Sequence, residues 1–533
     1  MAEKNNAMNH IPKEKFRFIH EGERLTDKKF EDKPIGYFKD AWIRFRKSRA
    51  SVVGALIIIF IILYAFLAPL FVTTHDQSFL VDRYAKKPGR LTALRPYGIF
   101  DGGVNREFSE KGLITQIAIG MGAEDKDGTG KVTLEEGMAS AYQPMLGEAT
   151  LTKTNNKGNY YSGRVDTYLE VGFIYIQIEQ ADLAKLQAWE QETGLNLLYP
   201  LINKNEYNPD ATGNNANYWY KMDAKFNPVV VRQDGSTGTI RLKDGMTLVD
   251  NYKRDADGNP IYWEYIGGGD LETAGLRVRV LYYNYYQYLY GFEPNYLFGT
   301  DSSGYDLALR IAGGIQLSLL IAVVVCLVNF VLGAIYGAIE GYYGGIVDMT
   351  LERVSDILAG VPFIIVATLF QMHLKNKLET QLPGNLSSIV CLLFAYVLTG
   401  WIGTASRVRT QFYRFKNQEY VMAARTLGAR DSRIIWKHIF PNTLGTLITS
   451  SALAIPSTIM SESMLSFLGI VKLGGPEGTS LGTLLSDASS IWNDYPHLML
   501  FPALVISLLM ISFNLFGNGL RDAFNPSLRG VEE

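Results

Sequence analysis

The feature that most constrains this chain is a set of long apolar runs with almost no charge. Residues Ala50–Val72 contain no charged side chain over 23 positions, so a helix rising about 1.5 Å per residue can cross a hydrocarbon core of about 30 Å. Ile315–Ile339 is a second clear run. Four less regular runs are Ile357–Met372, Ser387–Gly403, Leu444–Met460 and Leu498–Leu515. The sequence therefore predicts an α-helical membrane protein with six transmembrane helices.

The distribution of charge predicts which loops face the cytoplasm. Residues Lys4–Arg49 contain thirteen Lys and Arg against seven acids, and Arg407–Lys437 contain eight against two. Glu462–His497 contain one Lys and four acids. Because basic loops stay on the cytoplasmic side, six spans place both termini in the cytoplasm. The first apolar run starts too late and is too long for a cleavable signal.

The end of the N-terminal arm, Tyr37–Lys47, mixes aromatic and basic residues at helical spacing. This pattern is typical of a helix at the headgroup level, although a solvated linker would also fit.

The whole chain divides into five parts on this interpretation. They are a cytoplasmic arm (1–49), helix 1 (50–72), an extracellular insert (73–295), a core with helices 2–6 (296–524) and a cytoplasmic tail (525–533).

The insert has the composition of a folded, water-exposed domain. Residues His75–Gly291 contain 23 basic and 28 acidic side chains and no run of membrane length. Tyr168–Ile178 is rich in β-formers, and Ala181–Glu190 is an amphipathic helix pattern. Short strands with Asp-Gly turns between them are predicted at Val229–Val231, Thr239–Leu242 and Ile261–Tyr265. These patterns predict an α+β domain inserted between helices 1 and 2.

Composition also excludes several functions. A formal net charge of −2 with no domain-wide basic excess argues against a nucleic-acid partner. The two cysteines, Cys326 and Cys391, lie inside apolar runs and are predicted to be small buried hydrophobes. There is no Gly-x4-Gly-Lys-Ser/Thr loop, so the chain is not expected to bind ATP or to be an enzyme.

One basic loop between two apolar runs has the properties of a docking surface. Glu419–Gly428 predicts a short helix with two adjacent alanines, Ala423 and Ala424, which allow close approach of another backbone. Gly428 can end the helix, and Pro441 can begin the next one. An ordinary cytoplasmic helix-turn is the alternative, because paired alanines and a glycine are common.

The spacing of this loop resembles the EAA loop of ABC importer permeases, by which the membrane subunit engages its ATPase. Four further stretches resemble the dipeptide/oligopeptide permease family, in particular its C-type subunit. Their family patterns are FGTDxxGRD, GYYGG-xxD, ExxLSFLG and NxxGDGLRD…DP. The corresponding segments are Phe298–Asp306, Gly341–Gly345 with Asp348 and Arg353, Glu462–Gly469, and Asn514–Asp522 with Asn525–Pro526. Together they cover about 300 residues in the family order.

Five positions depart from these patterns. Tyr305 replaces the usual Arg, and Asn518 and Asn525 replace aspartates. Met422 stands where the family's name-giving glutamate would fall, and Phe440 stands where leucine is usual. The change at Met422 puts any salt bridge from that glutamate in doubt.

The resemblance implies the six-helix fold of an ABC importer permease and a role in an ATP-driven peptide importer of the bacterial plasma membrane. Such a subunit would form the translocation path with a second, homologous permease. Two ATPase subunits would carry ATP and Mg²⁺, and an extracellular binding protein would deliver peptide. The residues implied in coupling to the ATPases are Glu419, Ala423, Ala424, Gly428 and Pro441. The alternative is a membrane-anchored receptor or adhesion protein whose insert is the active part.

A separate motif in the insert predicts a structural calcium site. Asp125–Glu136 fits the twelve-residue EF-hand loop, with Gly130 at the tight turn and Glu136 at the bidentate position. The predicted ligands are Asp125, Asp127, Thr129, Lys131 (through its carbonyl), Thr133 and Glu136. A solvated turn before a helix at Leu134–Tyr142 is the alternative, and no second EF-hand loop pairs with it. No other cofactor is expected on this chain.

Two further features leave alternatives open. Tyr282–Tyr290 is an aromatic stripe that predicts a strand leading into the membrane interface, with a peptide path or a binding-protein contact as the alternative. Glu462 is an acid beside apolar sequence, and either a pathway residue or a hydrogen-bonded helix terminus would fit.

Overall fold

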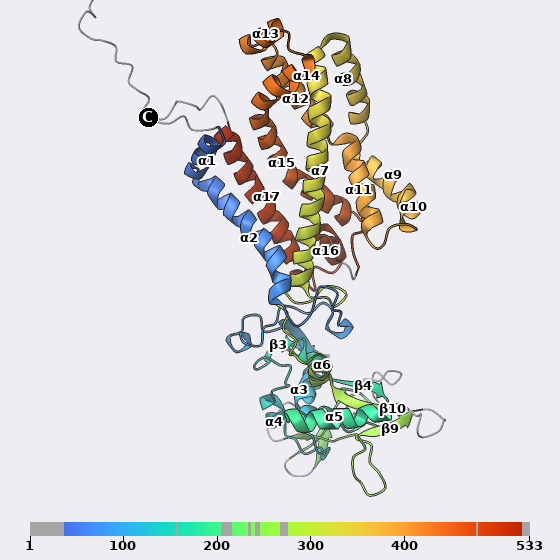
Figure 1. The fold of residues 1–533 in the computed structure, drawn as a ribbon. Coiled ribbons are helices and arrows are strands. Elements are labelled where there is room, and N and C mark those ends of the chain that lie inside the picture. The colour runs from blue at the N-terminus through green and yellow to red at the C-terminus, as the bar shows by residue number, and fades with distance from the viewer. Residues whose placement is uncertain are drawn as a thin grey trace, which may run out of the picture.

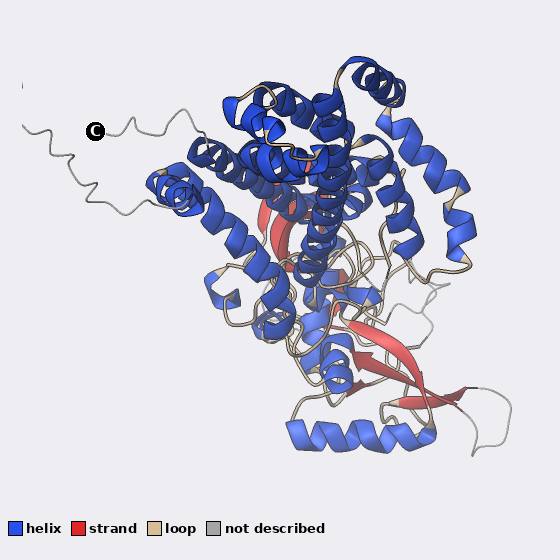
Figure 2. Cartoon of the chain, turned by 45° about the horizontal axis from the view of Figure 1, so that its top comes forward, coloured by secondary structure: helices blue, strands red, loops and turns tan. Residues whose placement is uncertain are grey.

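The chain forms a helical bundle and a mixed α/β domain joined end to end (Figure 1). The computed structural model describes residues 37–155, 158–203, 216–232, 236–239, 246–266, 275–475 and 478–524. Most of the predicted N-terminal arm, the tail 525–533, and the Asn525–Pro526 motif lie outside the described residues. Among the described residues every strand lies in the inserted domain, between Gly103 and Leu281, and Figure 2 draws the helices in blue and the strands in red.

The predicted helical membrane fold is confirmed. Among the described residues, five helices are long and apolar enough to cross a membrane, or six if one bent pair forms a single span. The five are α2 (Arg49–Phe71), α7 (Leu307–Tyr343), α11 with α12 (Leu386–Thr399 and Ile402–Phe415), the run α14–η5–α15 (Asp431–Arg433, Ile434–Ile439 and Phe440–Phe467), and α17 (Pro496–Phe524). Short helices α1 (Tyr37–Lys47), α10 (Lys375–Glu379), α13 (Glu419–Thr426) and α16 (Leu481–Ala488) complete the bundle.

The third predicted span is not one straight helix. The structure forms α8 (Gly345–Ala359) and α9 (Phe363–His373), which are bent by 69° at the break between them. Pro362 lies at this break as the N-cap of α9. Proline lacks the N–H that would continue α8 and disfavours helical geometry at the residue before it, so the helix ends there.

Small residues let α7 pack closely against α12. Gly333, Gly337 and Gly341 recur every four residues on α7, so they lie on one face. A Cβ atom at Gly337 would overlap the carbonyl of Ala405, and one at Gly341 would overlap the side chain of Phe412. Close backbone approach through small residues is a common basis of helix association in membranes.

The described residues of the insert form three antiparallel sheets. Their strand orders are β1–β3–β2, β4–β10–β5 with β9 also paired to β10, and β7–β6–β8. The strands are β1 (Gly103–Ser109), β2 (Thr150–Asn155), β3 (Gly158–Asp166), β4 (Phe173–Ile178), β5 (Leu198–Tyr199), β6 (Val229–Val231), β7 (Thr237–Thr239), β8 (Thr247–Leu248), β9 (Trp263–Ile266) and β10 (Gly275–Leu281). Helices α3 (Glu110–Glu124), α4 (Leu134–Ala139), α5 (Gln180–Thr193) and α6 (Tyr282–Tyr290) pack beside them.

Several local predictions for the insert are confirmed. The amphipathic helix is α5, Val229–Val231 is β6, and Tyr168–Ile178 contains β4 after a short 3₁₀ turn. The strand expected at Ile261–Tyr265 begins two residues later, and the helix expected at Leu134–Tyr142 ends at Ala139. The strand expected at Thr239–Leu242 lies mostly outside the described residues.

The prediction that Tyr282–Tyr290 is a strand is wrong, because this segment forms helix α6. Tyr282 and Tyr286 lie four residues apart and therefore share one helical face, which is buried against Tyr84. The centroid of the Tyr84 ring lies 5.0 Å from that of the Tyr282 ring and 5.3 Å from that of the Tyr286 ring. Packing at helical spacing therefore overrides the preference of tyrosine for strands.

A short antiparallel contact joins the insert to the bundle. Within Phe298–Asp306, the N–H of Thr300 donates to the carbonyl of Lys87 at 2.9 Å, and the carbonyl of Gly304 accepts from Val81 at 3.2 Å. His75 Nε2 lies 3.0 Å from Asp306 Oδ2, and both side chains are buried. Asp306 also caps α7, because its Oδ1 accepts from the N–H of Ala308 at 2.8 Å. The insert is thereby tied directly to the first turn of α7.

Candidate functional site: a coupling helix and a cavity at opposite ends of the bundle

Helix α13 lies at the end of the bundle farthest from the insert (Figure 1). It begins after Gln418, whose backbone is extended, and two backbone hydrogen bonds close its last turn. The N–H of Gly428 donates to Arg425 and that of Ala429 donates to Ala424, both at 3.0 Å. Gly428 has φ of +79°, a left-handed conformation that favours glycine. The predicted helix and its end at Gly428 are confirmed, while the coupling role stays a prediction.

The inner face of α13 is packed onto the bundle. Val421 is fully buried in a cluster that includes Phe412, Ile434 and Ile439, and Ala424 is also buried. A polar contact beside it joins α7 to α14, since the hydroxyl of Tyr342 donates to Asp431 Oδ1 at 2.6 Å, and Arg425 of α13 reaches the same hydroxyl through Nη2 at 3.5 Å. A displacement of α13 would therefore reach α7 and the α14–η5–α15 run directly.

The outer face of α13 and the turn after it expose large apolar side chains. Leu427 is 88% exposed, Met422 is 55% exposed and Tyr420 is 41% exposed. Ala423 and Glu419 are also exposed on this side of the loop. The sequence singled out the small residues, but the structure adds this apolar set, which the loop's basic composition conceals. Clustered exposed apolar groups are typical of a protein interface.

Pro441 lies in the first turn of α15, as expected, but no break separates α15 from the helical turns before it. Asp431–Phe467 is one helical run, and Pro441 lies at the first turn of its α15 part, directly after the π-helical segment Ile434–Ile439. A π-helical turn is wider than an α-helical turn, and such bulges are frequent at functional positions. The π-helical segment ends two residues before Pro441, and the helical run continues through α15 to Phe467.

A partly buried network of ion pairs joins α8 to α12. Arg409 of α12 contacts Asp348 through Nε at 2.5 Å and Nη2 at 2.8 Å, and it contacts Glu352 through Nη1 at 2.7 Å. The hydroxyl of Tyr413 donates to Asp348 Oδ2 at 2.7 Å. This network fastens α8 to α12. The GYYGG-xxD resemblance pointed to Asp348, but nothing in the sequence indicated Arg409.

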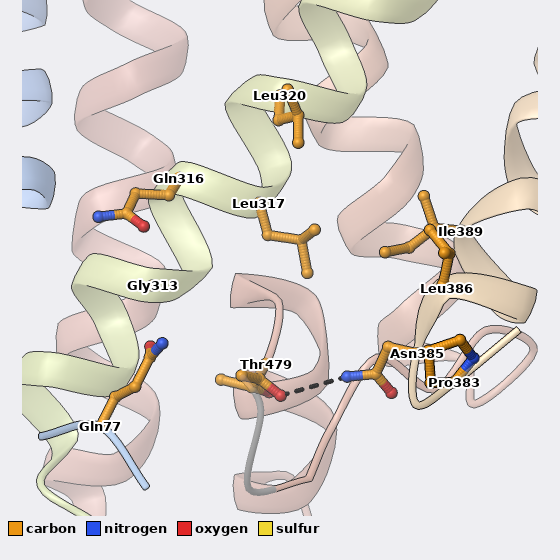
Figure 3. A pocket seen from close by; sticks show the side chains of 11 residues that line it. Gln77, Gly313, Gln316, Leu317, Leu320, Pro383, Asn385, Leu386, Ile389 and Thr479 are labelled. Carbon is orange, nitrogen blue, oxygen red and sulfur yellow. Dashed lines mark hydrogen bonds between the residues drawn. The ribbon is translucent and has the colours of Figure 1, made fainter.

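A cavity of about 460 Å³ opens near the insert-side end of the bundle, between α7, the start of α11 and the loop before α16. Figure 3 shows amide and apolar side chains around it. Among the described residues its lining contains no charged side chain and consists of Gln77, Gly313, Gln316, Leu317, Leu320, Pro383, Asn385, Leu386, Ile389, Gly478 and Thr479. Two amides are anchored, because Gln316 Nε2 donates to the carbonyl of Ala65 at 2.6 Å and Asn385 Nδ2 donates to that of Gly478 at 3.4 Å.

Glu462 lies elsewhere in the bundle and does not line this cavity. Its side chain is 1% exposed; Oε2 accepts from Ser318 of α7 at 3.0 Å, and Oε1 accepts from Ser466 at 2.9 Å. Of the two alternatives for this acid, the contacts favour the hydrogen-bonded one near the end of α15. The carboxyl joins α15 to α7.

The EF-hand-like segment is placed between two helices, α3 and α4. Asp125 follows α3, and its Oδ1 accepts from the N–H of Thr129 at 3.0 Å. Gly130 has φ of +66°, as expected of the tight-turn position. Glu136 and Thr133 form a reciprocal capping box at the start of α4. The segment lines a surface cavity of about 540 Å³ together with Asp127 and Lys131.

The positions of the carboxylates in the EF-hand-like segment show whether they could bind a calcium ion together. Among the described residues, no group of three His, Cys, Asp or Glu side chains converges on a point that could hold a metal ion. Burial raises the pKa of the Asp125 carboxyl, against the effect of its hydrogen bonds, whereas the N–H and hydroxyl of Thr133 lower the pKa of Glu136. Both carboxylates are engaged by their own loop, so as placed they do not fit a six-ligand site, and calcium binding stays a prediction.

Comparisons with known proteins match the chain on both sides of the insert. The family described as the binding-protein-dependent transport system inner membrane component matches residues 330–530. The family described as the N-terminal TM domain of oligopeptide transport permease C matches residues 36–88. Together with the helical bundle, these matches define a membrane-embedded permease of the binding-protein-dependent class.

Individual relatives give the same result. The chain is 39% identical over 238 residues to the oligopeptide transport system permease protein OppC of Bacillus subtilis (strain 168), which covers 44% of this chain and 73% of the relative. It is 38% identical over 238 residues to the dipeptide transport system permease protein DppC of the same organism, covering 44% and 70%. The chain belongs to the oligopeptide/dipeptide permease family of ABC importers. The family assignment supports a transport subunit and not the alternative of an anchored receptor or adhesion protein.

A solved structure of the MetNI methionine ABC transporter in an inward-facing conformation is also similar. It is 17% identical, covers 40% of this chain and 96% of that chain, and has a TM-score of 0.33. At this TM-score the likeness adds no support to the assignment.

Proposed function

We propose that this chain is the membrane-spanning subunit of an ATP-driven importer of short peptides. It forms the translocation path with a second, homologous permease, and two ATPase subunits supply the energy. The names of the relatives, which are oligopeptide and dipeptide permeases, support the peptide substrate. The observation that carries the proposal is the exposed apolar tip of α13, which is attached to the bundle on its other face.

The coupling step follows from that attachment. When the two ATPases close on ATP, they displace the exposed face around Leu427 and Met422. Val421 is buried among residues of the bundle, and Tyr342 is hydrogen-bonded to Asp431, so the displacement moves α7 and α15 together. Rigid movement of packed helices is an established route to alternating access in transporters. The chain itself performs no hydrolysis.

The amide-lined cavity suits a peptide in transit. Amide side chains both donate and accept hydrogen bonds, as the peptide backbone does. The leucines beside them accommodate apolar side chains, and the described part of the lining has no charge that would select among peptides. We place the insert-side entrance of the path here, where α7 and α11 begin.

The topology of the subunit follows from its charges. The basic loop that carries α13 faces the cytoplasm, as do both termini, and the insert lies outside the bacterial plasma membrane. The insert is fastened to α7 through the contacts of Phe298–Asp306. It therefore presents a fixed surface on which an extracellular peptide-binding protein can release its cargo.

Reconstitution of the complete transporter tests this proposal. Proteoliposomes containing this chain, the second permease and the two ATPases should accumulate a radiolabelled tripeptide when ATP is inside and binding protein is outside. Omitting this chain should abolish uptake, and an equally labelled sugar should not enter. Peptide uptake that is independent of this chain, or of ATP, would refute the assignment.

A further inference from the structure

A short loop of the insert, Leu94–Phe100, exposes apolar side chains at its tip. Tyr97 is 77% exposed and Ile99 is 55% exposed. The base of the loop is held firmly, because the N–H of Leu91 donates to the carbonyl of Phe100 at 2.7 Å. The exposed tip therefore projects from a loop whose base is fixed by a backbone hydrogen bond.

This loop is connected to a segment that enters the layer of the membrane spans. Next to it, Arg90 and Tyr296 exchange two backbone hydrogen bonds of 2.8 Å. Two residues further on, the Phe298 ring lies 4.3 Å from that of Phe501 in α17 and 6.4 Å from that of Tyr64 in α2. Tyr64 precedes the end of α2 by seven residues, which is about 10 Å along a helix. The base of the loop thus lies close to the bilayer surface.

Two further observations place the loop at this level. Figure 1 shows the blue segment that follows α2 lying directly against the insert-side end of the bundle. Lys86, in that segment, places its ammonium 5.7 Å from the centroid of the Tyr495 ring, just before α17 begins. A cation beside a tyrosine near the ends of spans is typical of the headgroup region.

We propose that the Leu94–Phe100 loop is a lipid contact that enters the headgroup layer of the leaflet nearest the insert. Tyrosine is favoured there because its ring is apolar and its hydroxyl is wet, and Ile99 adds apolar area beside it. The occupant is phospholipid because the base of the loop pairs with Tyr296, two residues before Phe298, whose ring packs on α17 and α2. The contact restrains the tilt of the insert at a second place besides the joint to α7, whatever substrate the transporter carries.

Site-directed labelling of the full chain tests this. In a Cys326→Ser, Cys391→Ala background, Tyr97→Cys and separately Ile99→Cys carry a nitroxide label, and the protein is placed in phospholipid nanodiscs. Tyr265→Cys is the matched control, because Tyr265 is 49% exposed on β9, at the end of the insert far from the bundle. The measurement is the ratio of collision rates with oxygen, which concentrates in lipid, and with a water-soluble nickel chelate.

The expected result is an oxygen-to-nickel ratio several-fold higher at positions 97 and 99 than at position 265. A water-like ratio at all three positions would overturn the proposal. Low accessibility to both reagents at positions 97 and 99 would also overturn it, in favour of burial against another protein. The fold of each labelled protein is checked by its melting temperature in the same nanodiscs.

Discussion

Leu427 provides the sharpest test of how the subunit engages its ATPases. Its side chain is 88% exposed in the turn after α13, so it contributes almost nothing to the stability of this chain alone. Burying a leucine side chain is worth about 1.5–3 kcal/mol relative to leaving it exposed. If the ATPase covers this side chain, Leu427→Ala should therefore cost about 2 kcal/mol of binding free energy, or about a thirtyfold increase in Kd.

The assay is the binding of the detergent-solubilised permease pair to its purified ATPase subunits, measured by biolayer interferometry. Leu151→Ala is the control, because Leu151 is 57% exposed on β2 of the insert and should leave the Kd unchanged. Both variants should melt within a degree or two of the parent, because exposed substitutions usually change stability by about 0.5 kcal/mol or less. A Kd for Leu427→Ala equal to that of Leu151→Ala would refute the docking of this face.

Three other outcomes are expected. Gly428→Val should place a β-branched residue at φ of +79°, cost about 1–2 kcal/mol in the loop, and lower peptide-driven ATP hydrolysis without loss of membrane insertion; full transport by this variant would rule out the docking role of Gly428. Tyr342→Phe removes the hydrogen bond to Asp431 and should weaken the linkage between ATP hydrolysis and uptake while ATPase binding is retained; an unchanged ratio of peptide to ATP would contradict this. If the insert binds calcium, adding it should raise the melting temperature, and Asp125→Ala with Glu136→Ala should abolish that rise; a melting curve indifferent to chelator would end the calcium prediction.

The sequence predicted those parts of the coupling loop that depend on local chemistry. The helix after Gln418 and its end at Gly428 follow from propensity and from the conformational freedom of glycine, which need no knowledge of the rest of the fold. The exposure of Leu427 could not be predicted, because it depends on which side of α13 the bundle covers. The contacts of Arg409 were missed for the same reason, since they join helices that are far apart in the sequence.

The first predicted span matches α2 in length, whereas the second is shorter than the helix that the structure forms. The run Ile315–Ile339 was limited to uncharged sequence, whereas α7 extends from Leu307 to Tyr343. Arg310 and Glu340 lie in these extensions and are only 4% and 3% exposed, because neighbouring segments of the chain cover them. Hydropathy measures the cost of exposing a charge to lipid and takes no account of burial within protein. The aromatic stripe Tyr282–Tyr290 is helical although tyrosine favours strands, because residues at helical spacing bury one face.

The chain segments on either side of the insert pair with each other, and Arg90 with Tyr296 is the pair nearest the inserted domain. Arg90 and Tyr296 are opposite each other in an antiparallel bridge, so the chain leaves the bundle and returns to it side by side. A neighbouring pair of this kind can be closed by a tight two-residue hairpin turn. An entire domain could therefore have been acquired at this point, or could be excised from it, without altering the path of the backbone through the bilayer.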